Sequence, residues 1–265
     1  MDYSGFRDIV VSVEDRVATF RLNRPETLNS FGPDSWDELL ALARMLNEDD
    51  EVRAVVCAPE GRGFSSGAYV GEQGTPDPST APRFADRTHR MGNAAIGLAM
   101  PSIDKPTIAA IDGVAAGAGM AFACSFDIRI LGPGARFTTV FVRRALGPDC
   151  GLTWFLPRLV GPGLAAELLF SGREVGAEEA LRIGLGNRLV DDPRGEAHSL
   201  ARELAQAPPL SILWSKRELR ESDRHSLSEQ IEFEWVVARH FRGTRDVEEG
   251  RRSFREKRAP RFTGE

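Results

Sequence analysis

Two short apolar segments of this 265-residue chain each run directly into glycine and other small residues. Residues 53–58, RAVVCA, precede PEGRGFSSGAYV, and residues 105–113, KPTIAAIDG, precede VAAGAGMAFACSF. Each pattern predicts a buried strand that turns into a helix, where small side chains let a ligand approach unpaired main-chain N–H groups. Two such turns can direct two N–H donors at one oxygen, which is the geometry of an oxyanion hole. Neither turn has the spacing of a nucleotide phosphate loop.

The other segments alternate between strand and helix patterns in the first part of the chain. Residues 9–14 and 17–22 alternate apolar and polar side chains and predict a hairpin. Pro33 suits the first turn of a helix, whose apolar residues recur at helical spacing. A Gly- and Pro-rich loop is expected at residues 71–82, and a helix over residues 83–100.

Strands that alternate with helices, followed by a helical tail, predict an α/β fold with an appended helical region. The composition changes near residue 192, so we place the α/β core and its ligand site in residues 1–192 and the helical region in residues 193–265. A chain of 265 residues that is 42% hydrophobic is long enough for one large domain of this kind.

Composition argues against several classes of function. Lys and Arg total 34 and Asp and Glu total 39, so a net charge of −5 gives no strong field for nucleic acid. No apolar run reaches the ~18 residues of a membrane span, and the N-terminus lacks a secretory pattern. The three cysteines and four histidines have no metal-ligand spacing. We expect a cytoplasmic protein without a metal, a membrane or a nucleic-acid partner.

One carboxylate stands in the turn LGPDCGLTW, at Asp149. It lies close in sequence to Leu146, Leu152 and Trp154, which predicts a water-poor setting. Asp149 is either an N-cap of the helix that begins near Gly151 or the acid/base of an enzyme. The residues alone leave both interpretations open.

Seven motifs occur in an order that resembles the crotonase (enoyl-CoA hydratase/isomerase) superfamily. They are LNRPETLNSF, GRGFSSGAYV, KPTIAAIDGVAAGAG, DIRI, PDCGLTWFLPRLVG, A..A...GL.N.LV and the tail D..EG.RSFREKRAPRFTG. The resemblance covers residues 11–264, nearly the whole chain. The fifth motif looks most like the phenylacetate-pathway type of enoyl-CoA isomerase.

This resemblance implies a spiral of ββα units with a C-terminal helical region for trimerisation, often extended to hexamers. The substrate would be an acyl-CoA thioester, and no cofactor would be needed beyond the coenzyme A that the substrate carries. The matching positions place the two oxyanion amides at Ala68 and Ala118. They also imply substrate or coenzyme A contacts at Arg24, Ser66, Ala68, Tyr69, Gly117, Phe141 and Lys257.

Departures from the family pattern narrow the expected reaction. The hydratases carry two catalytic glutamates, and the matching positions here are Ala121 and Phe141. Neither side chain can move a proton, so hydratase activity is disfavoured and Asp149 remains as the acid/base of an enoyl-CoA isomerase. Leu152 replaces a usual glycine, and Tyr69 replaces a usual aspartate.

Three alternatives stay open. Asp149 could attack the substrate as a nucleophile, in a hydrolase or dehalogenase acting on an acyl-CoA. A hydratase-like reaction on an enoyl-CoA is a second alternative. The chain could also be a non-catalytic subunit that binds acyl-CoA, since it lacks both glutamates.

Overall fold

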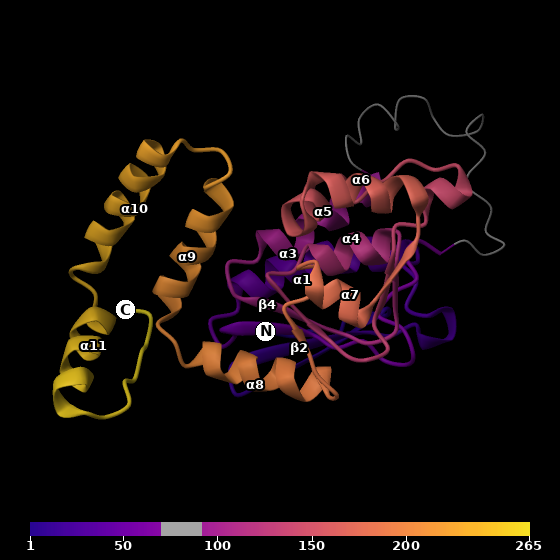
Figure 1. Ribbon diagram of the computed structural model, residues 1–265. Coiled ribbons are helices and arrows are strands. Elements are labelled where there is room, and N and C mark those ends of the chain that lie inside the picture. Colours follow the sequence, from indigo (N-terminus) through magenta and orange to yellow (C-terminus); the bar gives the residue numbers. More distant parts are fainter. Residues whose placement is uncertain (70–91) are drawn as a thin grey trace, which may run out of the picture.

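The computed structural model describes residues 1–69 and 92–265 of the chain (Figure 1). The loop expected at residues 71–82 and the first part of the helix expected at residues 83–100 lie outside these ranges. The remaining part of that helix is a 3-10 helix, η2 (Gly92–Leu98), followed by a short α-helix, α3 (Ala99–Ser102).

The N-terminal strands form the predicted hairpin. β1 (Ile9–Glu14) pairs antiparallel with β2 (Val17–Leu22). Both turn residues, Asp15 and Arg16, have positive φ angles of 49° and 65°, as a two-residue turn that matches the twist of the strands requires. The hairpin therefore supplies one edge of the main sheet.

The main sheet has six strands in the order β1-β2-β3-β4-β6-β9. From β2 onward all neighbours are parallel, through β3 (Ala54–Cys57), β4 (Thr107–Ile111), β6 (Ile128–Leu131) and β9 (Arg188–Leu189). Helices or longer connections join these parallel strands, which confirms the predicted α/β class. A second sheet has the order β5-β7-β8 and contains β5 (Val114–Ala116), β7 (Arg136–Thr138) and β8 (Glu174–Gly176).

Side chains that alternate along β3 fill two separate cores. Val55 and Cys57 belong to the larger core, whereas Ala54 and Val56 belong to a smaller core on the other face. The larger core is covered by α1 (Pro33–Glu48), α3 and α4 (Ala118–Cys124), and the smaller one by α8 (Pro193–Ala205). Figure 1 shows α8 on the opposite side of the sheet from these helices. The predicted division after residue 192 stays a prediction, and α8, which lies beyond it, packs on the sheet.

Several further short helices lie between the strands in sequence. They are η1 (Pro25–Thr27), η3 (Phe141–Arg144), α5 (Leu152–Val160), α6 (Pro162–Ser171) and α7 (Ala177–Arg182). α5 packs on both α4 and α6. All seven residues of α4 are buried, as its run of small and apolar residues predicts.

The last three helices extend from the core as an arm (Figure 1). The arm consists of α9 (Pro209–Glu221), α10 (Leu227–Phe241) and α11 (Arg245–Glu256). Leu227, Ile231 and Trp235 stand four residues apart on α10 and are 78%, 55% and 55% exposed. Within the described ranges, no helix has the length and apolar character needed to cross a membrane.

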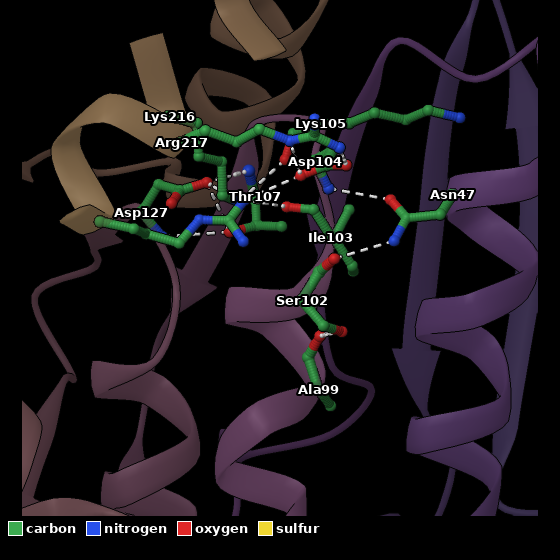
Figure 2. Close-up of polar contacts among 11 residues, drawn as sticks. Asn47, Ala99, Ser102, Ile103, Asp104, Lys105, Thr107, Asp127, Lys216 and Arg217 are labelled. Atoms are coloured by element: carbon green, nitrogen blue, oxygen red, sulfur yellow. Dashed lines mark hydrogen bonds and ion pairs between the residues drawn. The ribbon is translucent and has the colours of Figure 1, made fainter. Parts of the chain in front are cut away.

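A partly buried polar junction connects α9 to the core, and Figure 2 shows its contacts. The Lys216 ammonium lies 2.5 Å from the Asp127 carboxylate and donates to the carbonyl of Lys105 at 3.0 Å. Asp127 also accepts from the amide and the hydroxyl of Thr107, at 2.8 and 2.9 Å. Nearby, Asp104 pairs with Arg217. These bonds join α9 to the segments around β4 and β6, which are distant in sequence.

Candidate active site

The two glycine-containing turns predicted from the sequence lie side by side. The Ser65 amide donates to the carbonyl of Val114 and the Ala116 amide to that of Ser65, both at 2.9 Å. Gly67 has a φ of +87°, and a Cβ added to it would lie 3.2 Å from the nitrogen of Ala118. The absence of that Cβ lets the main chain before Ala68 approach the start of α4.

The amides of Ala68 and Ala118 lie in these two turns. The Phe31 amide donates to the carbonyl of Gly67, and the Tyr69 amide donates to the carbonyl of Phe31. Neither bond uses the Ala68 amide. Ala118 is the first residue of α4, and amides in the first turn of a helix have no partner within the helix. The arrangement therefore brings two main-chain donors to one region, as an oxyanion hole requires.

Two of the expected coenzyme A contacts come together beside these turns. The Arg24 guanidinium lies 5.2 Å from the ring centroid of Tyr69, within the range of a cation–π interaction. The same guanidinium lies 3.6 Å from Asp8. The hydroxyl of Ser66 donates to the Thr27 carbonyl at 2.9 Å, so in this structure that hydroxyl is bonded within the protein.

Asp149 lies in the turn that leads into α5, and two expectations about it are wrong for this chain. It is not the N-cap, because Gly151 occupies that position and no side chain caps the helix. It is also not enclosed by apolar side chains: Asp149 is exposed, Leu146 and Trp154 are 59% and 45% exposed, and Leu152 is buried in the core. Leu152 points into the core because α5 packs on α4, whereas Leu146 and Trp154 face the solvent.

Cys150, by contrast, is buried directly beside Asp149. It is 2% exposed, and burial raises the pKa of its thiol, with a further contribution from the charge of Asp149 and a hydrogen bond to it. Because the thiolate is the reactive form, the raised pKa disfavours nucleophilic attack by this cysteine.

The chain lies in a known family. Residues 12–265 match the family described as enoyl-CoA hydratase/isomerase. The chain belongs to the enoyl-CoA hydratase/isomerase family. It is 34% identical to the 1,2-epoxyphenylacetyl-CoA isomerase of Escherichia coli K12, over 97% of this chain and 98% of that protein. It is 30% identical to the short-chain-enoyl-CoA hydratase of Clostridium acetobutylicum, over 95% of each chain.

A solved structure of this enoyl-CoA hydratase/isomerase family confirms the crotonase fold. The enoyl-CoA hydratase of Bacillus anthracis superposes with a TM-score of 0.88 at 27% identity, covering 98% of this chain and all of the other. The recognition of the superfamily from its ordered motifs is thereby confirmed as well. Both a hydratase and an isomerase stand among the relatives, so the family alone does not decide between the two reactions.

The two positions that match the hydratase glutamates of the family lie against the second turn. Ala121 is fully buried, and its amide donates to the carbonyl of Gly117 at 3.0 Å. Phe141 is 7% exposed, and its ring would lie 3.8 Å from a Cβ on Gly117. These walls of the site are therefore apolar.

Within a single chain, Lys257 lies away from the two amide-bearing turns. It terminates α11 with a φ of +52°, and Figure 1 shows α11 well apart from α4.

Sequence reasoning missed Gly97, which lies under the turn that carries Asp149. A glycine inside a helical pattern gives no signal of what it contacts. In residues 1–69 and 92–265 no group of three His, Cys, Asp or Glu side chains is arranged to hold a metal ion.

Proposed function

We propose that the chain is an enoyl-CoA isomerase that uses Asp149 as its acid/base. One observation carries this proposal. Residues 62–69 and 113–125 contain the two amide-bearing turns, residues 141–152 run from Phe141 into α5, and Asp149 is the sole acidic residue in these three segments. The apolar Ala121 and Phe141 argue against a reaction in which two carboxylates activate water.

The chemistry follows from the groups at hand. The thioester oxygen accepts from the amides of Ala68 and Ala118, and negative charge moves to that oxygen when Asp149 removes a proton from the carbon chain. Asp149 then returns the same proton two carbons away, and the double bond moves between them. No water is consumed, and Asp149 ends in its starting state. One carboxylate is sufficient because both proton transfers occur on one face of the substrate.

The exposure of Asp149 sets a requirement on this mechanism. A carboxylate that faces water is a weak base for a carbon acid, since water stabilises its charged form. The bound acyl group, lying between the two amides and Asp149, must therefore displace that water. We infer a substrate with a bulky apolar acyl group, which agrees with the name of the 34% identical isomerase.

The deciding experiment compares wild type with Asp149→Asn, which preserves shape and removes the base. We expect wild type to convert a 3-enoyl-CoA into the conjugated 2-enoyl-CoA, followed by ultraviolet absorbance. We also expect it to exchange the α-protons of phenylacetyl-CoA with deuterium in D₂O. Asp149→Asn should lose at least about 10²-fold in both rates, the scale of general acid/base catalysis. Full activity of Asp149→Asn would refute the proposal.

The exposure of Asp149 also supports a second candidate, a hydrolase or dehalogenase in which Asp149 is a nucleophile. Its carboxylate would bond to the acyl carbon and displace the coenzyme A thiolate, or bond to a ring carbon and displace a halide, and water would then hydrolyse the resulting anhydride or ester to release the product. In H₂¹⁸O such an enzyme places ¹⁸O in the product and in Asp149, whereas an isomerase incorporates none. Thioester binding without either reaction would leave the role of a binding subunit.

We further propose that the chain assembles as a homotrimer or hexamer through its arm. The exposed apolar residues of α10 support this, because a lone soluble chain rarely exposes such a stripe. In this assembly Lys257 would meet the coenzyme A phosphates bound by a neighbouring copy, as a flexible point charge suited to phosphate.

A further inference from the structure

The turn that carries Asp149 rests on the α-carbon of one glycine in another element. Gly97 belongs to η2, and a Cβ added to it would overlap the carbonyl oxygen of Cys150 and lie 2.8 Å from the carbonyl carbon. It would also lie 3.5 Å from the nitrogen of Gly151. Only glycine leaves room for the main chain of this turn at its present place.

The helical side of this contact is held firmly. Ile96, Ala99 and Met100 are at most 1% exposed and belong to the larger core. Both α1 and α4 pack on η2. Because a close-packed core resists displacement, Gly97 cannot shift to relieve a clash.

The other side of the contact joins an exposed segment to a buried residue, since Cys150 is 2% exposed and belongs to the larger core. Residues 142–149 are exposed, so few packed neighbours hold them in place. The turn is also in an uncommon conformation, since Cys150 and Gly151 have φ angles of +52° and +78°. Its closing bond runs from the Leu152 amide to the carbonyl of Asp149 at 3.0 Å. The place of Asp149 is therefore set by how the main chain of Cys150 sits on Gly97.

We propose that Gly97 is a positioning residue for Asp149. Because Gly97 has no side chain, the Cys150 carbonyl can pack directly against its α-carbon, and this contact fixes the distance between the Asp149 carboxylate and the two oxyanion amides. This inference rests on the proposed role of Asp149 as acid/base. The three atoms nearest to a Cβ on Gly97 belong to Cys150 and Gly151, and none belongs to an amide-bearing turn.

The expected effect separates proton transfer from binding. Gly97→Ala pushes the Cys150 carbonyl, and Asp149 with it, away from η2. A misplacement approaching 1 Å costs up to about 10²-fold in rate, so we expect kcat to fall by about tenfold or more. The amides of Ala68 and Ala118 keep their places, so KM for the thioester stays within about twofold of wild type.

The test combines Gly97→Ala with Asp149→Asn and measures deuterium exchange into phenylacetyl-CoA by mass spectrometry, followed over hours so that slow rates are included. If Gly97 acts through Asp149, Gly97→Ala lowers the rate in wild type but adds no loss in the Asp149→Asn background. A wild-type rate in folded Gly97→Ala overturns the inference, and so does an equal further loss in the double variant. Full activity of Asp149→Asn alone would refute the proposed function instead, so the two failures are distinguishable.

A matched control and a second variant complete the design. Gly186→Ala places a Cβ against the side chain of Leu131, away from the turn, and should lower the melting temperature without lowering kcat. If Gly97→Ala does not fold, Gly151→Ala disturbs the same turn through its main chain, because Gly151 has a φ of +78° that alanine rarely adopts. A wild-type kcat in Gly151→Ala would show that the position of the turn does not matter, and would overturn the inference.

Discussion

At the scale of single residues, the spacing of the two amide-bearing turns depends on the absence of a side chain at Gly67. A Cβ there would lie 2.6 Å from the carbonyl oxygen of Ala116 and 3.2 Å from the Ala118 nitrogen. Gly67→Ala should separate the two amides, and the loss of one such donor lowers kcat by about 10²-fold or more. Steady-state kinetics with a 3-enoyl-CoA measures the effect.

Gly184→Ala is the control for Gly67→Ala. Gly184 has a similar φ of +81°, and its added Cβ would lie 3.0 Å from the Leu159 carbonyl, away from both turns. It should lose about 1–2 kcal/mol of stability because of the left-handed conformation and keep its kcat. Equal losses of kcat in both variants would mean that strain, rather than the amides, is responsible.

At the scale of elements, the attachment of α9 to the core depends unequally on the two partners of its ion pair, because only one of them is buried. The Lys216 side chain is 9% exposed and that of Asp127 is 34% exposed. Lys216→Met leaves a carboxylate that still accepts from Thr107 and meets water, so we expect a loss of about 1–2 kcal/mol. Asp127→Asn leaves a buried ammonium without its counter-charge and should cost about 3 kcal/mol or more. Denaturant unfolding of both variants gives the comparison, and the reverse order would contradict it.

The same junction predicts a dependence on pH. Burial lowers the pKa of Lys216 below its ordinary value of 10.5, and the charge of Asp127 offsets only part of this. Between the lowered pKa and 10.5, the unfolded chain therefore binds more protons at this site than the folded chain. The free energy of unfolding of wild type, relative to Lys216→Met, should rise as the pH rises toward 10.5. Chemical denaturation at several alkaline pH values tests this, and a falling difference would contradict it.

Local patterns in the sequence predicted the elements well, and contacts between distant elements account for what they missed. The hairpin about Asp15 and the buried helix α4 follow from side-chain periodicity and turn residues that lie within the segment itself. Lys216 stands on an amphipathic helix and gives no sign of burial, because its partner Asp127 is distant in sequence. The exposure of Asp149 likewise depends on how α5 packs on α4. Small residues that recur after two strands predicted a pair of turns with main-chain donors, and the family resemblance implied that the donors are the amides of Ala68 and Ala118.

At the scale of the whole molecule, the arm should decide the oligomeric state. Its exposed stripe on α10 consists of Leu227, Ile231 and Trp235. Replacing Ile231 and Trp235 together with glutamate would bury charges in any interface formed by this stripe, and we expect the assembly to dissociate. Sedimentation velocity measures the mass. Glu232→Ala, at an exposed position off the stripe, should leave the mass unchanged, and an unchanged mass in the double variant would exclude the stripe as the interface.

The donors that would grip the thioester oxygen belong to the main chain, so ordinary side-chain substitution at Ala68 or Ala118 cannot delete them. If the two amides stay in place, moving the acidic side chain to another position could change the reaction among hydrolysis, hydration and double-bond migration. A library of variants with Asp or Glu at positions 121, 141 and 149, singly and in combination, would therefore vary the acid while every variant keeps the same two amides for the thioester oxygen.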